Sequence, residues 1–370
     1  MARSASKGNV LILTIQSEEV ASTRQRILDY VPFLEEQGIR CVVKPAIPLK
    51  YSSKWGRRRD FLRRLGLLGV ETVLRFSHIL RSVSYDAVLV QKALFSTYWR
   101  GSARLLALCN PNIIYDIDDA VFRSMMTELP MPARILQDEK HIEKLVALSR
   151  RIIAGNPSLE AYARSLNPRC IMIPTSMSLK RYTPRSYEGD PKTVVIGWSG
   201  SDSTNENVNR IADVLRRLHA KYKNIRFLVI SNSMDRIDLK RFGPVPVEFL
   251  AFHLPTYIED LHTIDIGIMP LEDTEWNRMK CGGKLLQYMA CAIPAAASPV
   301  GVNLTIVEHG RNGFLASTDD EWVEILSRLI ESAELRKTIA LEGRKTVEQF
   351  YSVESQAPVF LGVIQSVLKE

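Results

Sequence analysis

The chain has 370 residues, of which 46% are apolar, and a formal net charge of +8. A chain of this length and apolar content is typical of two domains, each with its own core. No apolar run reaches the roughly 18 residues of a membrane-spanning helix, which excludes a helix of that kind.

The cysteines and the first residues bear on the cellular compartment. The five cysteines are odd in number, and none has a partner at the spacing of a metal site. We therefore expect reduced thiols in a cytoplasmic protein. The first nine residues lead directly into an apolar, strand-like run, so we expect a frayed terminus and not a signal peptide.

Short apolar runs alternate with helical patterns along the whole chain. This order predicts an α/β fold with parallel sheets. In the first half a helix is expected at 23–37, ended by Gly38. The strands expected there are 10–15, 40–44, 87–91, 113–116, 151–154 and 170–173.

Residues 50–83 are strongly basic, with a net charge of +7. The nine cations are Lys50, Lys54, Arg57, Arg58, Arg59, Arg63, Arg64, Arg75 and Arg81. Apolar residues recur among them at roughly helical spacing: Phe61, Leu62, Leu65, Leu68, Thr72, Val73, Phe76 and Leu80. We expect a basic amphipathic stretch that lies on an anionic membrane. The alternative is a surface helix with solvated arginines. Nucleic acid is disfavoured, because interleaved aromatic stacking residues are lacking.

Polar residues follow two of the expected strands. Gln91 and Lys92 end one strand, and Asp116, Asp118 and Asp119 follow the next. Because the carboxyl ends of parallel strands share one edge of a sheet, we expect these residues to lie at a ligand site. The aspartates have three interpretations: metal binding, hydrogen bonds to ligand hydroxyls, and capping of a following helix.

Residues 182–192 contain two prolines and one glycine but no apolar periodicity, which is typical of a linker. We therefore expect a Rossmann-like domain at 1–182, a linker at 183–192 and a second domain at 193–345. A C-terminal helix at 346–370 is expected to pack back on the first domain. In the second domain the expected strands are 193–198, 226–230, 265–270 and 293–299, and a helix is expected at 205–222.

The segment from Lys280 to Ala292 places two glycines and a lysine at the start of a short apolar helix. The first N–H groups of a helix and its dipole favour an anion. Gly282 and Gly283 let a ligand approach the backbone, and Lys284 adds a charge. The alternative is that the glycines only turn the chain and Lys284 is solvated.

A second turn of this kind follows the strand at 193–198. There Gly200 and Ser201 offer backbone N–H groups and a hydroxyl to an anion. The Gly-x-x-Gly spacing differs from a nicotinamide fingerprint, which disfavours a dehydrogenase. Two such turns in one domain predict a diphosphate ligand.

These motifs resemble the donor-binding domain of retaining glycosyltransferases of the GT-B type, family four (group 1). The specific match runs from 280 to 316, with Tyr288-Met-Ala-Cys-Ala-Ile-Pro294, Ser298-Pro-Val-Gly301, Ile306-Val-Glu-His-Gly310 and Asn312-Gly-Phe-Leu-Ala316. Looser matches are Gly197-Trp-Ser-Gly-Ser201, Tyr115-Asp-Ile-Asp-Asp119 and Ala21-Ser-Thr-Arg-Gln-Arg26.

The resemblance implies two Rossmann-like doubly wound domains that face each other across a cleft, with the acceptor side in the first. It implies a UDP-, GDP- or dTDP-sugar donor, a hexosyltransferase-like reaction with retention of configuration, and no required metal or other cofactor. Gln91 and Lys92, which end a strand at the carboxyl edge of the first sheet, are expected on the acceptor side. Arg24 and Arg26, just after the first strand, either face the acceptor too or are surface charges.

The chain departs from the family pattern at two positions. Met279 and Gln287 stand where the family has glutamates that contact the sugar and the ribose. The amide of Gln287 can still bind a ribose hydroxyl. Met279 cannot bind a sugar hydroxyl, so Asp273 or Glu275 would have to take the role of the glutamate that the family has at position 279. Arg278 and Lys280 join Lys284 as the cations of the diphosphate site, and His253 is a candidate neighbour of the base.

We therefore expect a glycosyltransferase in which Lys284, Asp118 and Asp119 are the catalytic residues. The expected acceptor is a lipid-linked or envelope glycan, and the expected location is the cytoplasm, on the inner face of the membrane through residues 50–83. The alternative is a catalytically inactive scaffold that binds a nucleotide sugar at the membrane, favoured by the replacements at 279 and 287.

Overall fold

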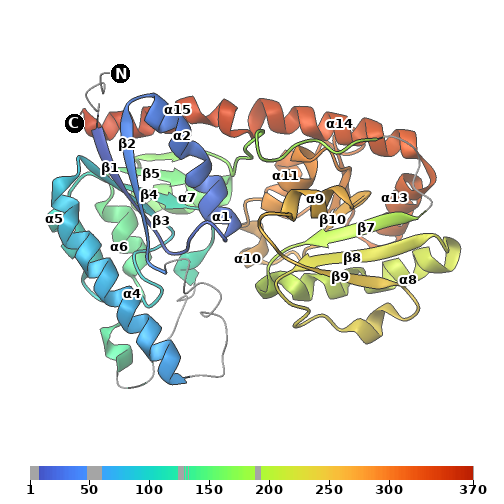
Figure 1. Ribbon diagram of the computed structural model, residues 1–370, viewed down its shortest axis with the longest axis horizontal. Coiled ribbons are helices and arrows are strands. Elements are labelled where there is room, and N and C mark those ends of the chain that lie inside the picture. The colour runs from blue at the N-terminus through green and yellow to red at the C-terminus, as the bar shows by residue number, and fades with distance from the viewer. Residues whose placement is uncertain are drawn as a thin grey trace. The chain divides into compact units, whose positions relative to one another are not determined.

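The computed structural model describes residues 8–47, 61–123, 129, 131, 133–187 and 193–369, without the side chains of 61–65. The chain folds as two compact units that divide after Thr175 and after Ser355, and the residues from Gln356 onward belong to the first unit. These divisions differ from the boundaries expected at 182 and 345. Each unit contains a six-stranded parallel sheet with helices around it (Figure 1).

The sheet of the N-terminal unit has the strand order β2-β1-β3-β4-β5-β6. Its strands are β1 (Gly8–Thr14), β2 (Ile39–Pro45), β3 (Ala87–Gln91), β4 (Ile113–Ile117), β5 (Arg151–Ala154) and β6 (Cys170–Met172). The helices are α1 (Ala21–Arg26), α2 (Val31–Glu36), α4 (Phe61–Arg81), α5 (Ser102–Cys109), α6 (His141–Leu148), α7 (Pro157–Leu166) and, after the second unit, α15 (Val353–Leu368). All six strands predicted for this half are confirmed.

The single helix predicted at 23–37 is wrong. The chain forms α1, a 3-10 turn at Leu28–Tyr30 and then α2, with Ile27 outside helical geometry between them. Pro32 lies in the first turn of α2. In a continuous helix its ring would clash with the carbonyl of Leu28 and would supply no N–H to it. A helix can begin at this proline but cannot run through it.

The buried face of α4 differs from the expected apolar face. It consists of Leu68, Glu71, Arg75 and Ile79, which recur at helical spacing. The Glu71 carboxylate accepts hydrogen bonds from the backbone N–H (2.7 Å) and hydroxyl (2.5 Å) of Ser96, after β3. Arg75 donates to the carbonyls of Lys44 and Thr14 in β2 and β1.

These contacts remove Arg75 from the cations expected to lie on a membrane, whereas the membrane contact of residues 50–83 stays a prediction. Arg75 is fully buried, and burial lowers its pKa to about 9, whereas Val73 and Leu80 are exposed. Of the nine predicted cations, Arg81 is the one whose described side chain is exposed. Residues 50–60, including Arg57, Arg58 and Arg59, lie outside the described residues. None of the described helices is both long enough and apolar enough to cross a bilayer.

The sheet of the C-terminal unit has the strand order β12-β11-β10-β7-β8-β9. Its strands are β7 (Val194–Ser199), β8 (Ile225–Ser231), β9 (Val247–Ala251), β10 (Ile266–Met269), β11 (Ala295–Ala297) and β12 (Phe314–Leu315). The helices are α8 (Ala212–Lys221), α9 (Tyr257–His262), α10 (Glu275–Arg278), α11 (Gly283–Ala290), α12 (Asn303–Ile306), α13 (Asp319–Glu331) and α14 (Ala333–Phe350). The four strands predicted here are confirmed, and β9 and β12 were not predicted.

The predicted helix 205–222 is corrected to a 3-10 helix at Asp202–Ile211 followed by α8. Alternate residues of β7 enter two different cores, which explains why this strand has no polar residue from Val194 to Trp198. Ile196 packs on one face of the sheet with α8 and α13, and Val195 packs on the other with α9, α11 and α14. A strand buried on both faces has no polar alternation.

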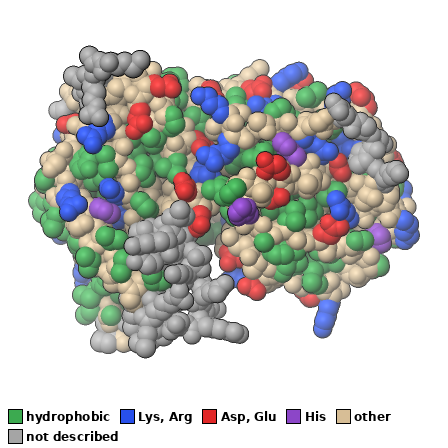
Figure 2. All heavy atoms as spheres, in the orientation of Figure 1, with side chains coloured by type: hydrophobic (Ala, Val, Ile, Leu, Met, Phe, Trp, Pro, Cys, Tyr) green, Lys and Arg blue, Asp and Glu red, His purple; other side chains and the backbone are tan. Residues whose placement is uncertain are grey.

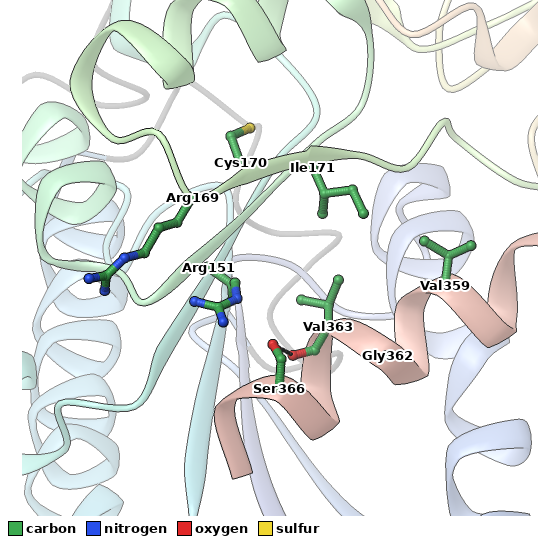
Figure 3. Close-up of a pocket in the computed structure, with 8 residues that line it drawn as sticks. All are labelled: Arg151, Arg169, Cys170, Ile171, Val359, Gly362, Val363 and Ser366. Carbon is green, nitrogen blue, oxygen red and sulfur yellow. Dashed lines mark hydrogen bonds between the residues drawn. The ribbon is translucent and has the colours of Figure 1, made fainter. Parts of the chain in front are cut away.

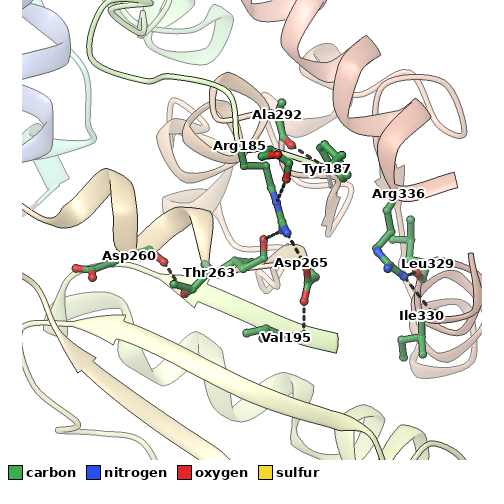
Figure 4. Close-up of polar contacts among 12 residues, drawn as sticks. Arg185, Tyr187, Val195, Asp260, Thr263, Asp265, Ala292, Leu329, Ile330 and Arg336 are labelled. Atoms are coloured by element: carbon green, nitrogen blue, oxygen red, sulfur yellow. Dashed lines mark hydrogen bonds and ion pairs between the residues drawn. The ribbon is translucent and has the colours of Figure 1, made fainter. Parts of the chain in front are cut away.

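The described part of the predicted linker is bonded to the C-terminal unit (Figure 4). Arg185 forms an ion pair with Asp265 (2.9 Å), whose other carboxylate oxygen accepts the N–H of Val195 (2.8 Å). The Tyr187 hydroxyl donates to the carbonyl of Ala292 (2.8 Å). These bonds explain why the C-terminal unit begins at Ser176 and includes the described part of the predicted linker.

Candidate active site

The glycine turn before α11 has the geometry of an anion-binding loop. Gly282 precedes the helix with φ +68°, a backbone conformation that favours glycine, and as the N-cap residue it has no side chain with which to cap the first turn. The first N–H groups of α11 therefore have no intrahelical acceptor. Lys284 is the second residue of the helix, as predicted.

Lys284 lies directly over the loop that follows β7. Its Nζ is 3.3 Å from the Thr204 hydroxyl and 5.2 Å from the centre of the Trp198 ring. A Cβ added at Gly200 would stand 2.4 Å from Lys284 Cε and 2.4 Å from the indole. Only glycine fits at 200, so the structure brings the two predicted glycine turns together at this lysine.

The role predicted for the Gly200 N–H is corrected. This N–H donates to the carbonyl of Ile230 (3.0 Å) and extends the sheet ladder, so it does not face a ligand. Ser201 is exposed beside it, and its hydroxyl lies 2.9 Å from that of Ser203. The glycine contributes space for Lys284 and not a hydrogen bond.

The other predicted cations of this site differ in their surroundings. Arg278 forms a two-pronged ion pair with Asp273, at 2.6 Å and 2.8 Å. That bond lowers the pKa of Asp273 and offsets the charge of Arg278. Lys280 is half-buried, with Nζ 6.0 Å from the centre of the Trp276 ring. Lys280 and Lys284 therefore supply the positive charge of the loop.

Gln287 is buried in a hydrogen-bond network of tyrosines that sequence reasoning missed. Its Oε1 accepts from the Tyr257 hydroxyl (2.8 Å), and its Nε2 donates to that of Tyr182 (3.2 Å). The Tyr257 hydroxyl also bonds that of Ser199 (2.9 Å), and the Ser199 N–H donates to the Tyr288 hydroxyl (2.7 Å). Burial raises the pKa of Tyr257 and Tyr288, so both hydroxyls stay neutral.

This network changes the interpretation of Gln287. With both amide atoms bonded and 5% of its surface exposed, Gln287 positions β7 and its loop against α11. The structure does not support the predicted ribose contact. A glutamine one turn along an apolar helix was the only sequence signal, because Tyr182 and Tyr257 come from two distant segments.

We expect Gln287→Leu to lower the free energy of unfolding by about 1 to 3 kcal/mol, because two buried hydrogen bonds, to the Tyr182 and Tyr257 hydroxyls, are lost. Urea unfolding without ligand measures this change. Gln349→Leu, at an exposed position of α14, is the matched control. Equal stability of the two variants would contradict the positioning role.

The predicted base and sugar contacts lie at separate places in the C-terminal unit. His253 is exposed after β9, and Glu275 is exposed at the start of α10. Met279, at the family's first glutamate position, is half-buried just after α10. These roles stay predictions.

In the N-terminal unit, Lys92 and Asp118 come together at the carboxyl edge of the sheet. Lys92 Nζ is 3.8 Å from Asp118 Oδ2. Lys92 has φ +67°, which is strained for a residue other than glycine. Its N–H donates to the Asp116 carbonyl, and its carbonyl accepts from the Tyr115 hydroxyl. Backbone strain held from both sides is frequent at functional sites.

Asp118 has an unusual acidity. Burial raises its pKa to about 6, although the Lys92 charge opposes this shift. Asp116 and Asp119 add to the increase, and Arg26 opposes it. A carboxyl group that titrates near neutral pH is typical of catalytic sites.

Among the remaining residues predicted for this edge, Arg24 and Arg26 have structural contacts. Arg26 forms a buried ion pair with Asp116 and donates to the Ile173 carbonyl (2.6 Å), which corrects its placement at the acceptor or the surface. Arg24 is 1% exposed and bonds the Glu18 carbonyl, so it is not a surface charge either. Gln91 is buried at the end of β3.

The contacts of Asp119 bear on the three interpretations of the aspartates, which were metal binding, ligand hydroxyls and helix capping. Asp119 Oδ1 accepts the N–H of Ala120 (2.9 Å), just before a 3-10 helix at Val121–Arg123, which favours the capping interpretation. Within the described ranges, no three His, Cys, Asp or Glu side chains gather in a way that would hold a metal ion.

One family of known proteins and several individual relatives are similar in sequence to part of this chain. The family described as Glycosyl transferases group 1 matches residues 193–332. The capsular polysaccharide biosynthesis glycosyltransferase CapM of Staphylococcus aureus is 25% identical over 165 residues, 43% of this chain and 42% of CapM. Glycosyltransferase 1 domain-containing protein 1 of Xenopus tropicalis is 22% identical over 42% of this chain and 45% of its own length. The matches thus span less than half the length of these relatives.

Solved structures share the whole architecture. HepE of Anabaena, solved in complex with UDP and glucose, has a TM-score of 0.67 and 16% identity, over 96% of this chain and 99% of HepE. Sucrose-phosphate synthase of Thermosynechococcus elongatus has a TM-score of 0.68 and 14% identity, over 98% and 99%. At such identities the likeness establishes the fold, which is GT-B with two Rossmann-like units. Residues 193–332, which carry the Lys284 loop, match the group 1 glycosyl transferase family.

Proposed function

We propose that the protein is a glycosyltransferase that takes a sugar from a nucleoside diphosphate donor. The observation that carries the proposal is the position of Lys284, which lies over Gly200 at the uncapped first turn of α11. A helix N-terminus with a lysine beside it is a site for the two phosphates. The UDP and glucose in the HepE complex support a nucleotide sugar as the donor class.

The proposed chemistry follows from the charges. Departure of a nucleoside diphosphate places negative charge on the β-phosphate, and Lys284 with the α11 N–H groups stabilises that charge as it develops. Asp118 contacts the acceptor hydroxyl, with Lys92 holding the carboxylate in its ionised form. Retention of configuration and a hexosyl group are parts of the proposal that rest on the family resemblance.

The acceptor is proposed to be a lipid-linked or envelope glycan, and the protein to act in the cytoplasm on the inner face of the membrane. The name of CapM, which places that relative in capsular polysaccharide biosynthesis, supports a glycan acceptor. On the face drawn in Figure 2, the described acidic and basic side chains are interspersed. The proposed membrane contact rests on the basic residues of the sequence at 50–64.

We expect Arg57, Arg58, Arg59, Arg63 and Arg64, replaced together by Gln, to reduce sedimentation of the protein with anionic vesicles. Each cation near such a surface contributes about 1 kcal/mol of binding. The control replaces the exposed Arg216, Arg217, Arg236, Arg241 and Arg311 of the C-terminal unit by Gln. If both variants sediment like the unmodified protein, the membrane contact is wrong.

The second candidate function is a scaffold that binds the nucleotide sugar but does not transfer it. Met279, where the family has a glutamate, favours this candidate. A thermal-shift panel of nucleoside diphosphates and nucleotide sugars tests both, because a ligand that binds the native state raises the unfolding temperature. Stabilisation with release of nucleoside diphosphate supports the transferase. Stabilisation without release across a range of acceptors supports the scaffold, and no stabilisation at millimolar ligand contradicts both.

A further inference from the structure

The N-terminal unit exposes a group of aliphatic side chains on and beside α4, which we call the apolar patch. Its members are Val70, Val73, Met131, Ile135 and Leu136. Val70 and Val73 lie on the side of α4 opposite its buried face, and Val73 is 70% exposed. Ile135, in a short 3-10 helix, is 71% exposed. Single exposed aliphatic residues are common, whereas a group of them marks a contact surface.

One short segment joins the two halves of the patch. The Trp99 indole donates to the Thr72 hydroxyl of α4 (3.0 Å). The next residue, Arg100, donates its N–H to the carbonyl of Leu136 (2.8 Å), and Trp99 also forms an isolated bridge with Gln137. Residues 99 and 100 therefore hold the 3-10 helix beside α4, so the five side chains belong to one surface.

The exposed charges around the patch are mainly positive. The segments that form the patch and its border are 66–74, 99–104 and 131–140. Within them Glu71 is buried, and Asp138 forms an ion pair with Lys144 (2.6 Å). The exposed charged residues that the structure describes there are Arg100, Arg104, Arg134, Glu139 and Lys140. Four cations and one acid around an apolar centre favour a partner with an anionic surface.

The patch lies toward the edge of the sheet that carries Asp118. The segments with Trp99 and with the 3-10 helix follow the carboxyl ends of β3 and β4. The Tyr98 hydroxyl donates to the carbonyl of Val121 (3.0 Å), two residues after Asp119. The pocket between β5, β6 and α15 contains the first residues of these two strands, so it lies at the opposite edge (Figure 3).

We propose that the apolar patch enters an anionic lipid membrane, with the surrounding cations at the level of the headgroups. Aliphatic side chains gain free energy on leaving water, and cations near anionic lipid add to the binding. The inference rests on the proposed lipid-linked acceptor, because this orientation presents the Asp118 edge to a membrane. It differs from a contact through the basic residues at 50–64 alone, which salt would screen.

Sedimentation of the full chain with vesicles of phosphatidylglycerol and phosphatidylcholine tests the proposal. At about 1 M salt the Debye length is about 3 Å, so attraction between charges is largely screened. The unmodified protein is expected to keep part of its binding at this high salt. Val73→Ser, Ile135→Ser and Leu136→Ser together are expected to weaken the remaining binding at least about tenfold, because three aliphatic side chains no longer enter the lipid.

The matched control replaces Leu239, Leu304 and Leu341 together by Ser. These leucines are exposed in the C-terminal unit, so the control removes as many exposed aliphatic side chains outside the patch. It is expected to bind vesicles like the unmodified protein. Nucleoside diphosphate binding, measured by calorimetry, is expected to be unchanged in both variants, so this test and that of the donor site fail independently.

The outcomes separate the patch from other contacts. Vesicle binding of the patch variant equal to that of the control would overturn the proposal. Loss of all binding of the unmodified protein at high salt would also overturn it and would leave a contact by charge alone. If no protein sediments at any salt concentration, both the patch and the contact at 50–64 are wrong. Equal vesicle binding together with a smaller oligomer of the patch variant in ultracentrifugation would assign the patch to contacts between copies of the chain.

Discussion

Lys284→Ala is expected to weaken nucleoside diphosphate binding, or to lower turnover, at least about tenfold, which corresponds to roughly 1.4 kcal/mol. Lys284 Nζ lies between the Thr204 hydroxyl and the Trp198 ring, above the uncapped turn of α11. Because Arg278 is paired with Asp273, few other charges near this turn can replace it. Calorimetric titration with UDP, GDP and dTDP, followed by assays with the matching sugar donor, measures the loss.

Lys223→Ala is the control for Lys284→Ala, since Lys223 is exposed on the same unit between α8 and β8. Its affinity is expected to equal that of the unmodified protein. Thr204→Ala removes the hydroxyl that contacts Lys284 but keeps the lysine charge. A smaller loss of nucleoside diphosphate affinity than in Lys284→Ala is therefore expected. A folded Lys284→Ala protein with unchanged affinity and turnover would remove Lys284 from the donor site.

Asp118→Asn is expected to lower turnover about 100-fold or more while leaving the binding of the nucleoside diphosphate unchanged. The proposed role requires a carboxylate, and an amide of the same shape cannot take it. Measuring the donor Kd and kcat separately tests whether turnover falls while donor binding stays unchanged. Asp86→Asn, at an exposed residue just before β3, is the control, and it is expected to keep full turnover. A turnover equal to that of this control would contradict the catalytic role.

The same carboxyl group predicts a pH dependence. Burial raises the pKa of Asp118 to about 6, so its charged form is present above pH 6 and is lost as the pH falls through that value. Turnover is therefore expected to decline on the acid side near pH 6. Lys92→Met removes a charge that lowers this pKa, so the decline is expected to move to higher pH. If the acid-side decline in turnover stays at the same pH in Lys92→Met, the assignment of this decline to Asp118 is wrong.

The strands and the glycine turns could be predicted from sequence because their causes are local. The ten predicted strands are short apolar runs between polar segments, and each is present. The turn at Gly282 could be recognised because a positive φ before a helix favours glycine, and this preference needs no distant partner. The likeness of residues 280–316 to a known family is also a property of consecutive residues, and the family match at 193–332 agrees with it.

Which charged and polar residues are buried was decided by tertiary structure alone. Arg75 and Gln287 look like a surface cation and a ligand contact in the sequence, yet both are buried with distant partners. Arg26 meets Asp116 only because β1 and β4 bring their carboxyl ends to one edge of the sheet. Such pairing depends on contacts between residues far apart in the chain, and local periodicity carries no information about them. The sequence by itself therefore determined the α/β class and the location of the two glycine turns, whereas the identification of the buried, structurally bonded charges required the fold.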